Sequence, residues 1–211
     1  MSVGEALRAA VRSCYENSWR LLLLNLALCG FVLAVVLASL WMPLLVVSAL
    51  ALGPLAAALM HCAVTLVRVG ELRFADAIDG LRTHWRRGFV LGMSSGAAGA
   101  LTVVAVRFYA GRAAWPLAFV ALYFALLFLV YQLPLWALAV LERERGLRAV
   151  ARDAGVVLVK RPAAWTALAS ALVLINVLGL AAALVPFLTL TVAYSFVATA
   201  HLAVPPDLKE V

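Results

Sequence analysis

Acidic residues are absent from six long stretches of this sequence, and their absence indicates the class of the protein. The stretches cover residues 21–40, 44–67, 89–106, 115–141, 163–185 and 187–204. Each is close to the ~20 residues that a helix needs to cross a ~30 Å hydrocarbon core. A charged fraction of 13% and a mean hydropathy of +1.06 exclude a water-soluble globular domain. We therefore expect an all-α polytopic membrane protein, a bundle of six transmembrane helices in three hairpins.

We expect neither a removable signal peptide nor a separate soluble domain. The first 19 residues have no compact apolar core followed by a small-residue cleavage site, so the stretch from Leu21 is expected to be retained as a span. Six spans and their connections use most of the 211 residues. We expect one transmembrane domain over residues 1–211.

Catalytic and metal-binding motifs are missing as well. The three cysteines, Cys14, Cys29 and Cys62, have no CxxC spacing and are expected to be small apolar fillers. There is no HExxH, Walker A, GxGxxG or Ser/His/Asp pattern, and carboxylates occur only beside the predicted spans. We expect no enzyme activity, cofactor or metal, with lipid modification as the enzymatic alternative left open.

Basic residues are distributed unevenly between the two sides of the membrane. Arg107 and Arg112 would lie outside, and the other 15 of the 17 basic residues would lie in the termini and connectors on the N-terminal side. The positive-inside rule then places both termini in the cytoplasm, in a bacterial inner membrane.

The net charge of +7 does not indicate nucleic-acid binding, because basic and acidic residues alternate at the membrane borders. Anionic lipid headgroups attract such residues by ~1 kcal/mol each. The basic residues expected to contact lipid or a partner protein are Arg82, Arg86, Arg87, Arg152, Lys160 and Arg161.

A weak repeat divides the chain into residues 5–67, 73–141 and 147–204. Each unit starts with an amphipathic segment, Glu5–Trp19, Arg73–Trp85 or Leu147–Arg161, and continues with two spans. Apolar residues recur at helical spacing in these segments, for example at Phe74, Ile78, Leu81 and Trp85. We expect three interfacial helices on the cytoplasmic side.

Several short segments resemble the YesL-like family of bacterial membrane proteins. They are residues 24–26 (LNL), 53–59 (GPLAAAL), 66–68 (LVR) with Glu71, 74–77 (FADA), 85–89 (WRRGF), 134–135 (PL) and 201–202 (HL). The resemblance implies about six spans and no assigned catalytic activity. Members of the family often occur beside carbohydrate uptake systems, so it also implies a role beside a sugar ABC transporter.

Two prolines within the apolar stretches predict irregular helices. Pro54 follows Gly53 near the middle of the second stretch, and Pro134 follows Gln132 and Leu133 in the fourth. Proline removes a backbone donor and clashes with the preceding turn. Such a break is found at transporter substrate sites, but the neighbouring alanines favour a kink that serves helix packing.

Polar residues within the spans are the remaining candidates for a site. His61 and His201 are predicted at a similar depth and could meet in a metal or proton-relay site, although a neutral histidine bonded to a neighbouring carbonyl is the simpler interpretation. Asn25, Gln132 and Asn176 are expected to join helices by hydrogen bonds. Gly92 and Gly96 belong to a small-residue face that predicts a tight interface.

Two functions remain. The first is an accessory or assembly subunit that binds a membrane protein, or a second copy, through its apolar faces and basic connectors. The alternative is a small transporter or channel for a small molecule or a lipid-like solute. The scarcity of polar residues in the outer halves of the spans favours the first.

Overall fold

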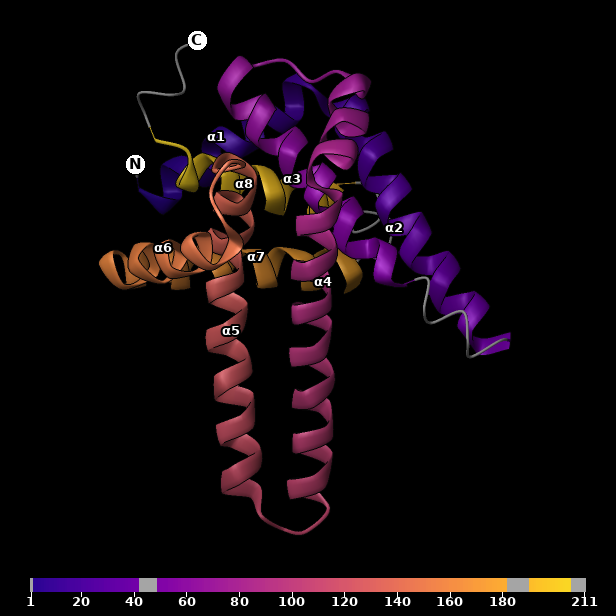
Figure 1. Ribbon diagram of the computed structural model, residues 1–211, viewed down its shortest axis with the longest axis vertical. Coiled ribbons are helices and arrows are strands. Elements are labelled where there is room, and N and C mark those ends of the chain that lie inside the picture. The colour runs from indigo at the N-terminus through magenta and orange to yellow at the C-terminus, as the bar shows by residue number, and fades with distance from the viewer. Residues whose placement is uncertain (1, 42–48, 182–189, 206–211) are drawn as a thin grey trace.

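The computed structural model describes residues 2–41, 49–181 and 190–205, and the regular elements of these residues are all helices (Figure 1). The α-helices of the described residues are α1 (Val3–Glu16), α2 (Ser18–Trp41), α3 (Leu52–Val69), α4 (Phe74–Ala110), α5 (Trp115–Leu141), α6 (Leu147–Lys160), α7 (Pro162–Ala181) and α8 (Val192–Ala203). The predicted all-α class is confirmed.

Five of these helices, α2, α3, α4, α5 and α7, are long and apolar enough to cross a membrane. The sixth predicted span, residues 187–204, is represented by α8, which has 12 residues. Residues 187–189 lie outside the described part of the chain. Twelve residues of α-helix rise only about 18 Å. The described residues therefore support a multi-pass protein, whereas six crossings stay a prediction.

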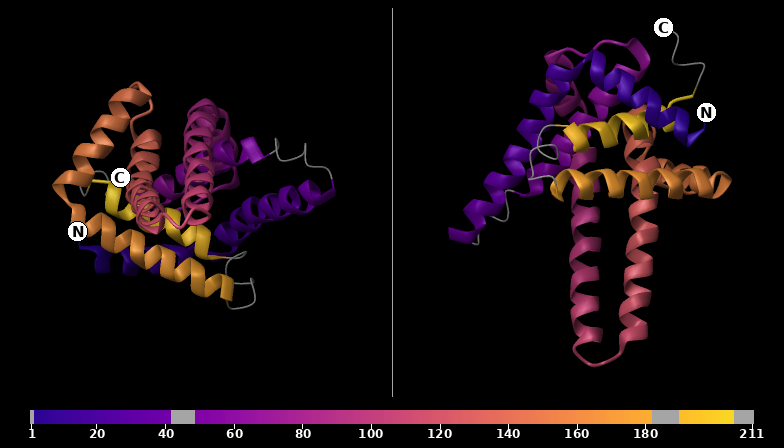
Figure 2. Two further views of the ribbon diagram at one scale, coloured as in Figure 1. Left: turned by 90° about the horizontal axis from the view of Figure 1, so that it is seen from below. Right: turned by 180° about the vertical axis from the view of Figure 1, so that it is seen from behind.

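Helices α4 and α5 form a long hairpin that extends away from the other helices (Figures 1 and 2). The turn between them, residues 111–114, lies at the lower end of Figure 1, and the connections before α4 and after α5 lie at the other end. Helices α6 and α7 run across the hairpin axis in the side views of both figures. The described residues therefore do not confirm an arrangement of three parallel hairpins.

The second predicted interfacial helix is not a separate helix. The segment Arg73–Trp85 belongs almost entirely to α4, which starts at Phe74 and runs unbroken for 37 residues to Ala110. Arginine favours helix, and no proline interrupts the sequence between Trp85 and Phe89. The predicted boundary there is wrong, while α1 and α6 are separate helices close to the predicted ranges.

The amphipathic segments turn their large apolar side chains outward. In α1, Val11 is 59% and Tyr15 83% exposed, while the small residues Ala6 and Ala10 are fully buried. The tyrosine hydroxyl of Tyr194 in α8 donates to the Leu7 carbonyl of α1 over 3.1 Å. Small residues thus allow α1 to pack closely on α8, and the larger side chains remain available to lipid.

Helices α3 and α4 cross so closely that the contact requires glycine. A Cβ atom on Gly92 would lie 2.6 Å from Cα of Gly53, and one on Gly88 would lie 2.8 Å from Cα of Pro54. Carbon atoms normally approach to about 3.5–4.0 Å. The interface predicted from the small residues of α4 is therefore an internal one at Gly92, whereas a Cβ atom on Gly96 would meet nothing.

The helix changes its type just before Gly53 and Pro54. Residues 49–51 form a 3₁₀ turn, and the regular helix α3 begins at Leu52. Proline clashes with the carbonyl four residues earlier, here Leu50, which lies in that turn. The change of helix type agrees with the predicted irregularity. Residues 42–48 of the same apolar stretch lie outside the described residues, so the position of the irregularity at mid-span stays a prediction.

Arg87 of α4 holds the end of α5. Its Nη1 donates to the carbonyls of Ala139 and Glu142, both over 2.9 Å. Its Nη2 donates to the carbonyls of Arg143 and Arg145. The last carbonyls of a helix have no partner within the helix and carry partial negative charge. The guanidinium satisfies them, so Arg87 has an internal role that the prediction of lipid or partner contact did not include.

Asn17 makes a similar link at the other connection. Its side-chain oxygen accepts from the Leu72 backbone N–H over 3.3 Å, and its amide donates to the Gly70 carbonyl over 3.3 Å. Gly70 ends α3 with a φ of +79°, a conformation that favours glycine. The junction of α1 and α2 thus fixes the connection between α3 and α4.

Replacing Gly92 by alanine should destabilise the protein by about 1–3 kcal/mol, because the added methyl group meets backbone that cannot rotate away. The measurement is the thermal unfolding midpoint in mild detergent. Gly96→Ala, one turn further along α4, is the matched control and should not lower the midpoint. Equal midpoints for the two variants would contradict the close crossing.

Replacing Arg87 by methionine should cost about 2 kcal/mol, because the carbonyls at the end of α5 lose charged hydrogen-bond donors. Arg86→Met is the control, because Arg86 is exposed. Within the described residues, the contact found for its guanidinium is with the Trp85 ring, and Cζ lies 5.3 Å from the ring centroid. Unfolding in denaturant, followed by helical circular dichroism, compares the two. A loss of the same size in Arg86→Met would refute the role of Arg87.

Candidate functional site

Two of the predicted polar residues join helices, as expected. The Asn25 side-chain oxygen accepts from the backbone N–H of Ala193 over 2.8 Å, which ties α2 to α8. The Asn176 amide donates to Ser195 Oγ over 2.7 Å, which ties α7 to α8. Both asparagines therefore act in packing.

The two predicted histidines have different neighbours. Nε2 of His201 lies 3.1 Å from Ser13 Oγ of α1. The His61 ring lies beside the ring of His84 of α4, with 5.2 Å between the centroids. Among the described residues, no group of three or more His, Cys, Asp or Glu side chains is placed to hold a metal ion. A joint site of His61 and His201 finds no support in these contacts.

Gln132 is buried without a hydrogen bond to the described residues. It is 8% exposed, and neither its amide nitrogen nor its oxygen has a partner there. It lines a cavity of about 150 Å³ toward α8 and a groove of about 550 Å³ between α4 and α5. Pro134, two residues later, is buried inside α5, which continues through it to Leu141. The prediction that Gln132 joins helices is therefore not met within the described residues.

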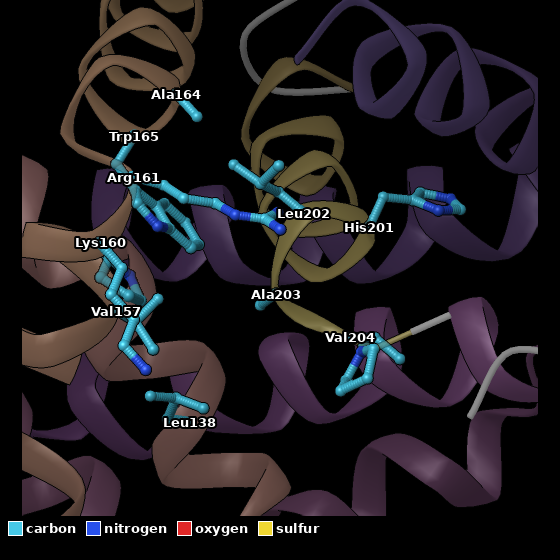
Figure 3. Close-up of a pocket in the computed structure, with 12 residues that line it drawn as sticks. Leu138, Val157, Lys160, Arg161, Ala164, Trp165, His201, Leu202, Ala203 and Val204 are labelled. Atoms are coloured by element: carbon cyan, nitrogen blue, oxygen red, sulfur yellow. The ribbon is translucent and has the colours of Figure 1, made fainter. Parts of the chain in front are cut away.

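A cavity of about 320 Å³, here called the basic cavity, lies where α5, α6, α7 and α8 meet (Figure 3). Lys160, Arg161 and the buried Trp165 form one side, and α8 faces them. The His201 ring points away from Lys160 and Arg161 in Figure 3. Exposed basic residues next to a tryptophan are typical of a membrane border that contacts anionic headgroups.

A second cavity with polar lining, here called the histidine cavity, lies between α3, α4 and the end of α5 and has a volume of about 530 Å³. Arg68, Arg143 and Asp79 are exposed residues of its lining. His84 is 2% exposed, and its Nδ1 has no hydrogen-bond partner in the described residues. The cavity therefore combines charged groups at its rim with imidazole groups in its wall.

Sequence reasoning missed His84. It was assigned to an interfacial helix, where a histidine would face water or headgroups. In the structure Gly80, His84 and Gly88 form one buried face of α4, at a spacing of four residues. A Cβ atom on Gly80 would lie 2.9 Å from the His61 side chain, so glycine is needed to admit that ring. Glycines four residues before and after a histidine were the available signal.

The other basic candidates lie at the surface. Arg82 and Arg86 are exposed on α4. Arg152 Nε lies 3.5 Å from the neighbouring Asp153 carboxylate, with 76% of the arginine side chain exposed. Their positions are compatible with lipid or partner contact, which stays a prediction.

The cysteines are buried, as expected for apolar fillers. Burial raises the pKa of the Cys14 thiol in α1 to about 12, so this thiol stays protonated at neutral pH.

Comparison of the chain with protein-family profiles, curated proteins and solved structures gives no match.

Substitution of the two buried amides should have opposite effects. Gln132→Leu should leave stability unchanged or raise it, because it removes a buried amide without a partner among the described residues. Asn25→Leu should lower stability by about 1–2 kcal/mol, because the Ala193 N–H loses its acceptor. The measurement is the unfolding midpoint of each purified variant, compared with that of the unchanged protein. A destabilised Gln132→Leu would show that the glutamine amide has a partner.

Proposed function

We propose that this chain is a non-enzymatic accessory or assembly subunit that binds a transmembrane helix of a partner protein in the groove between α4 and α5. The resemblance to YesL-like proteins suggests a carbohydrate ABC transporter as the partner complex. The observation that carries the proposal is Gln132, whose amide has no hydrogen-bond partner among the described residues, at an apolar groove with mostly small residues on its α4 side.

The groove has the features of a helix-binding surface in lipid. Its α4 side is mostly small residues, including Ser95, Gly99 and Thr102, with Leu101 among them, and its α5 side includes Phe124 and Ala125. Small residues allow two helix backbones to approach closely, which is the main source of helix association in membranes. A Cβ atom on Gly99 would meet nothing within 4 Å, so the chain itself does not fill this position.

Gln132 places a buried polar group beside this surface. A buried amide without a partner costs free energy, and in lipid no water is present to satisfy it. A serine, threonine or asparagine on a partner helix would supply the missing hydrogen bond, at about 1–2 kcal/mol. A partner helix with one polar residue therefore fits the groove better than acyl chains do.

The alternative function, a small transporter or channel, has less support. Residues 88–106 of α4 and residues 115–141 of α5 contain no charged side chain. The groove beside them is mainly apolar, with Gln132 at one end. A pathway for a polar solute along this hairpin would have few hydrogen-bonding groups.

The proposal retains the topology predicted from the sequence. Six crossings would place both termini on the cytoplasmic side of a bacterial inner membrane. The segment that enters the hairpin, residues 68–87, has five arginines, and the connection after α5, residues 142–146, has two. Both lie toward the end of the hairpin opposite to residues 111–114, which agrees with this orientation.

Filling the groove with a larger side chain should prevent binding of the partner helix. The tagged chain is purified from native membranes in mild detergent, and retained proteins are quantified by mass spectrometry. Gly99→Leu should reduce the amount of a stoichiometric membrane partner at least about tenfold, a loss of about 1.4 kcal/mol. Gly96→Leu is the matched control, since Gly96 is equally open but does not line the groove.

Gln132→Leu should also weaken retention of the partner, although the isolated chain is not destabilised. Equal retention by Gly99→Leu and Gly96→Leu would refute docking in the groove. A chain that purifies without any partner, and that moves a solute in proteoliposomes, would support the transporter instead.

A further inference from the structure

The lining of the histidine cavity contains two arginines that form no ion pair with the described residues. Arg68 lies in the last turn of α3, and Arg143 follows α5, so the two arginines reach the rim from different helices. Among the described residues, neither arginine forms an ion pair within 4.0 Å, and neither does Asp79 of the same rim. The lining thus contains two guanidinium groups and one carboxylate, and the Asp76 carboxylate also lies near His61.

Arg143 is held at this rim by backbone contacts. Arg87 donates to the carbonyls of Glu142 and Arg143, which fixes the chain direction where it leaves α5. Arg145, two residues later, pairs with Glu142 and Asp153, each over 2.8 Å. The side chain of Arg143 is therefore presented by a fixed backbone, which lowers the entropic cost of binding.

The wall of the cavity contributes hydrogen-bonding groups rather than further charge. Thr65 of α3 and Thr83 of α4 supply hydroxyl groups, and His61 and His84 supply imidazole nitrogens. His84 Nδ1 is buried and has no partner in the described residues, which costs free energy unless a ligand pairs with it. Hydroxyls, imidazoles and guanidinium forks are the groups that bind phosphate oxygens.

We propose that the histidine cavity binds a phosphate-bearing anion, with Arg68 and Arg143 on its charge and His84 and the threonines on its remaining oxygens. The cavity volume of about 530 Å³ exceeds that of a lone ion and admits a phosphorylated headgroup. A phospholipid headgroup and a free organic phosphate share this chemistry. The site depends on neither the groove nor a partner protein.

The test uses the full chain purified in a phosphate-free maltoside detergent. In one arm, glycerol phosphate is titrated by calorimetry; in the other, retention of added phosphatidylglycerol is measured by native mass spectrometry. Arg68→Gln and Arg143→Gln should each weaken binding of the ligand about tenfold, in whichever of the two experiments detects binding. Arg82→Gln, an exposed arginine of α4 outside the cavity, is the matched control and should bind normally.

The histidines provide a readout that is independent of the arginine substitutions. The chain has three histidines, so nitrogen-labelled imidazole signals can be assigned from single variants. Ligand should shift the signals of His61 and His84 and leave that of His201, which lines the basic cavity, unchanged.

Each outcome decides the proposal. Binding of glycerol phosphate identifies a free phosphate as the ligand class, and retention of phosphatidylglycerol alone identifies a lipid headgroup. Binding in neither arm, or binding that both arginine variants retain, would overturn the proposal. Equal shifts at all three histidines would do so as well.

Discussion

The close crossing of α3 and α4 is the constraint on which the other features depend. Gly53, Gly88 and Gly92 allow the two backbones to touch, and this contact fixes the rotation of α4 about its axis. With position 88 facing α3, position 84 one turn earlier faces it too, so His84 reaches His61. Position 87 then points sideways to the end of α5, where Arg87 binds the free carbonyls. One packing contact thus orients both the histidine cavity and the long hairpin.

The buried polar side chains fall into two classes, and the difference suggests their roles. Asn25 and Asn176 have partners on α8, so they stabilise the arrangement of helices. Gln132 and His84 have buried polar atoms without partners in the described residues, and each lines a cavity or groove. A buried polar group without a partner is costly in a membrane protein. A ligand or partner that forms the missing hydrogen bond would offset this cost, whereas helix packing alone would not.

The sequence allowed the all-α class, most of the long apolar helices and the packing roles of Asn25 and Asn176 to be predicted. It did not reveal that Arg73–Trp85 joins the following span, because residues that suit an interfacial helix also suit the start of a longer one. Nor did it reveal the pairing of His61 with His84. Periodicity defines the faces of a single helix, whereas the neighbour of each face depends on how glycines allow two helices to approach. Arg87 was assigned to the surface for the same reason.

The length of α4 has a mechanical consequence. Its 37 residues form a rod of about 55 Å, well beyond a ~30 Å hydrocarbon core. The rod crosses α3 near Gly92, about 27 Å from its far end at Ala110. It therefore acts as a lever with its pivot at the glycine contact. A tilt of about 5° would move the far end by about 2 Å by the same geometry. Events at the histidine cavity, where His84 lies about 12 Å from the pivot along α4, would be transmitted to the distal end of the hairpin, about 27 Å from the pivot on the other side.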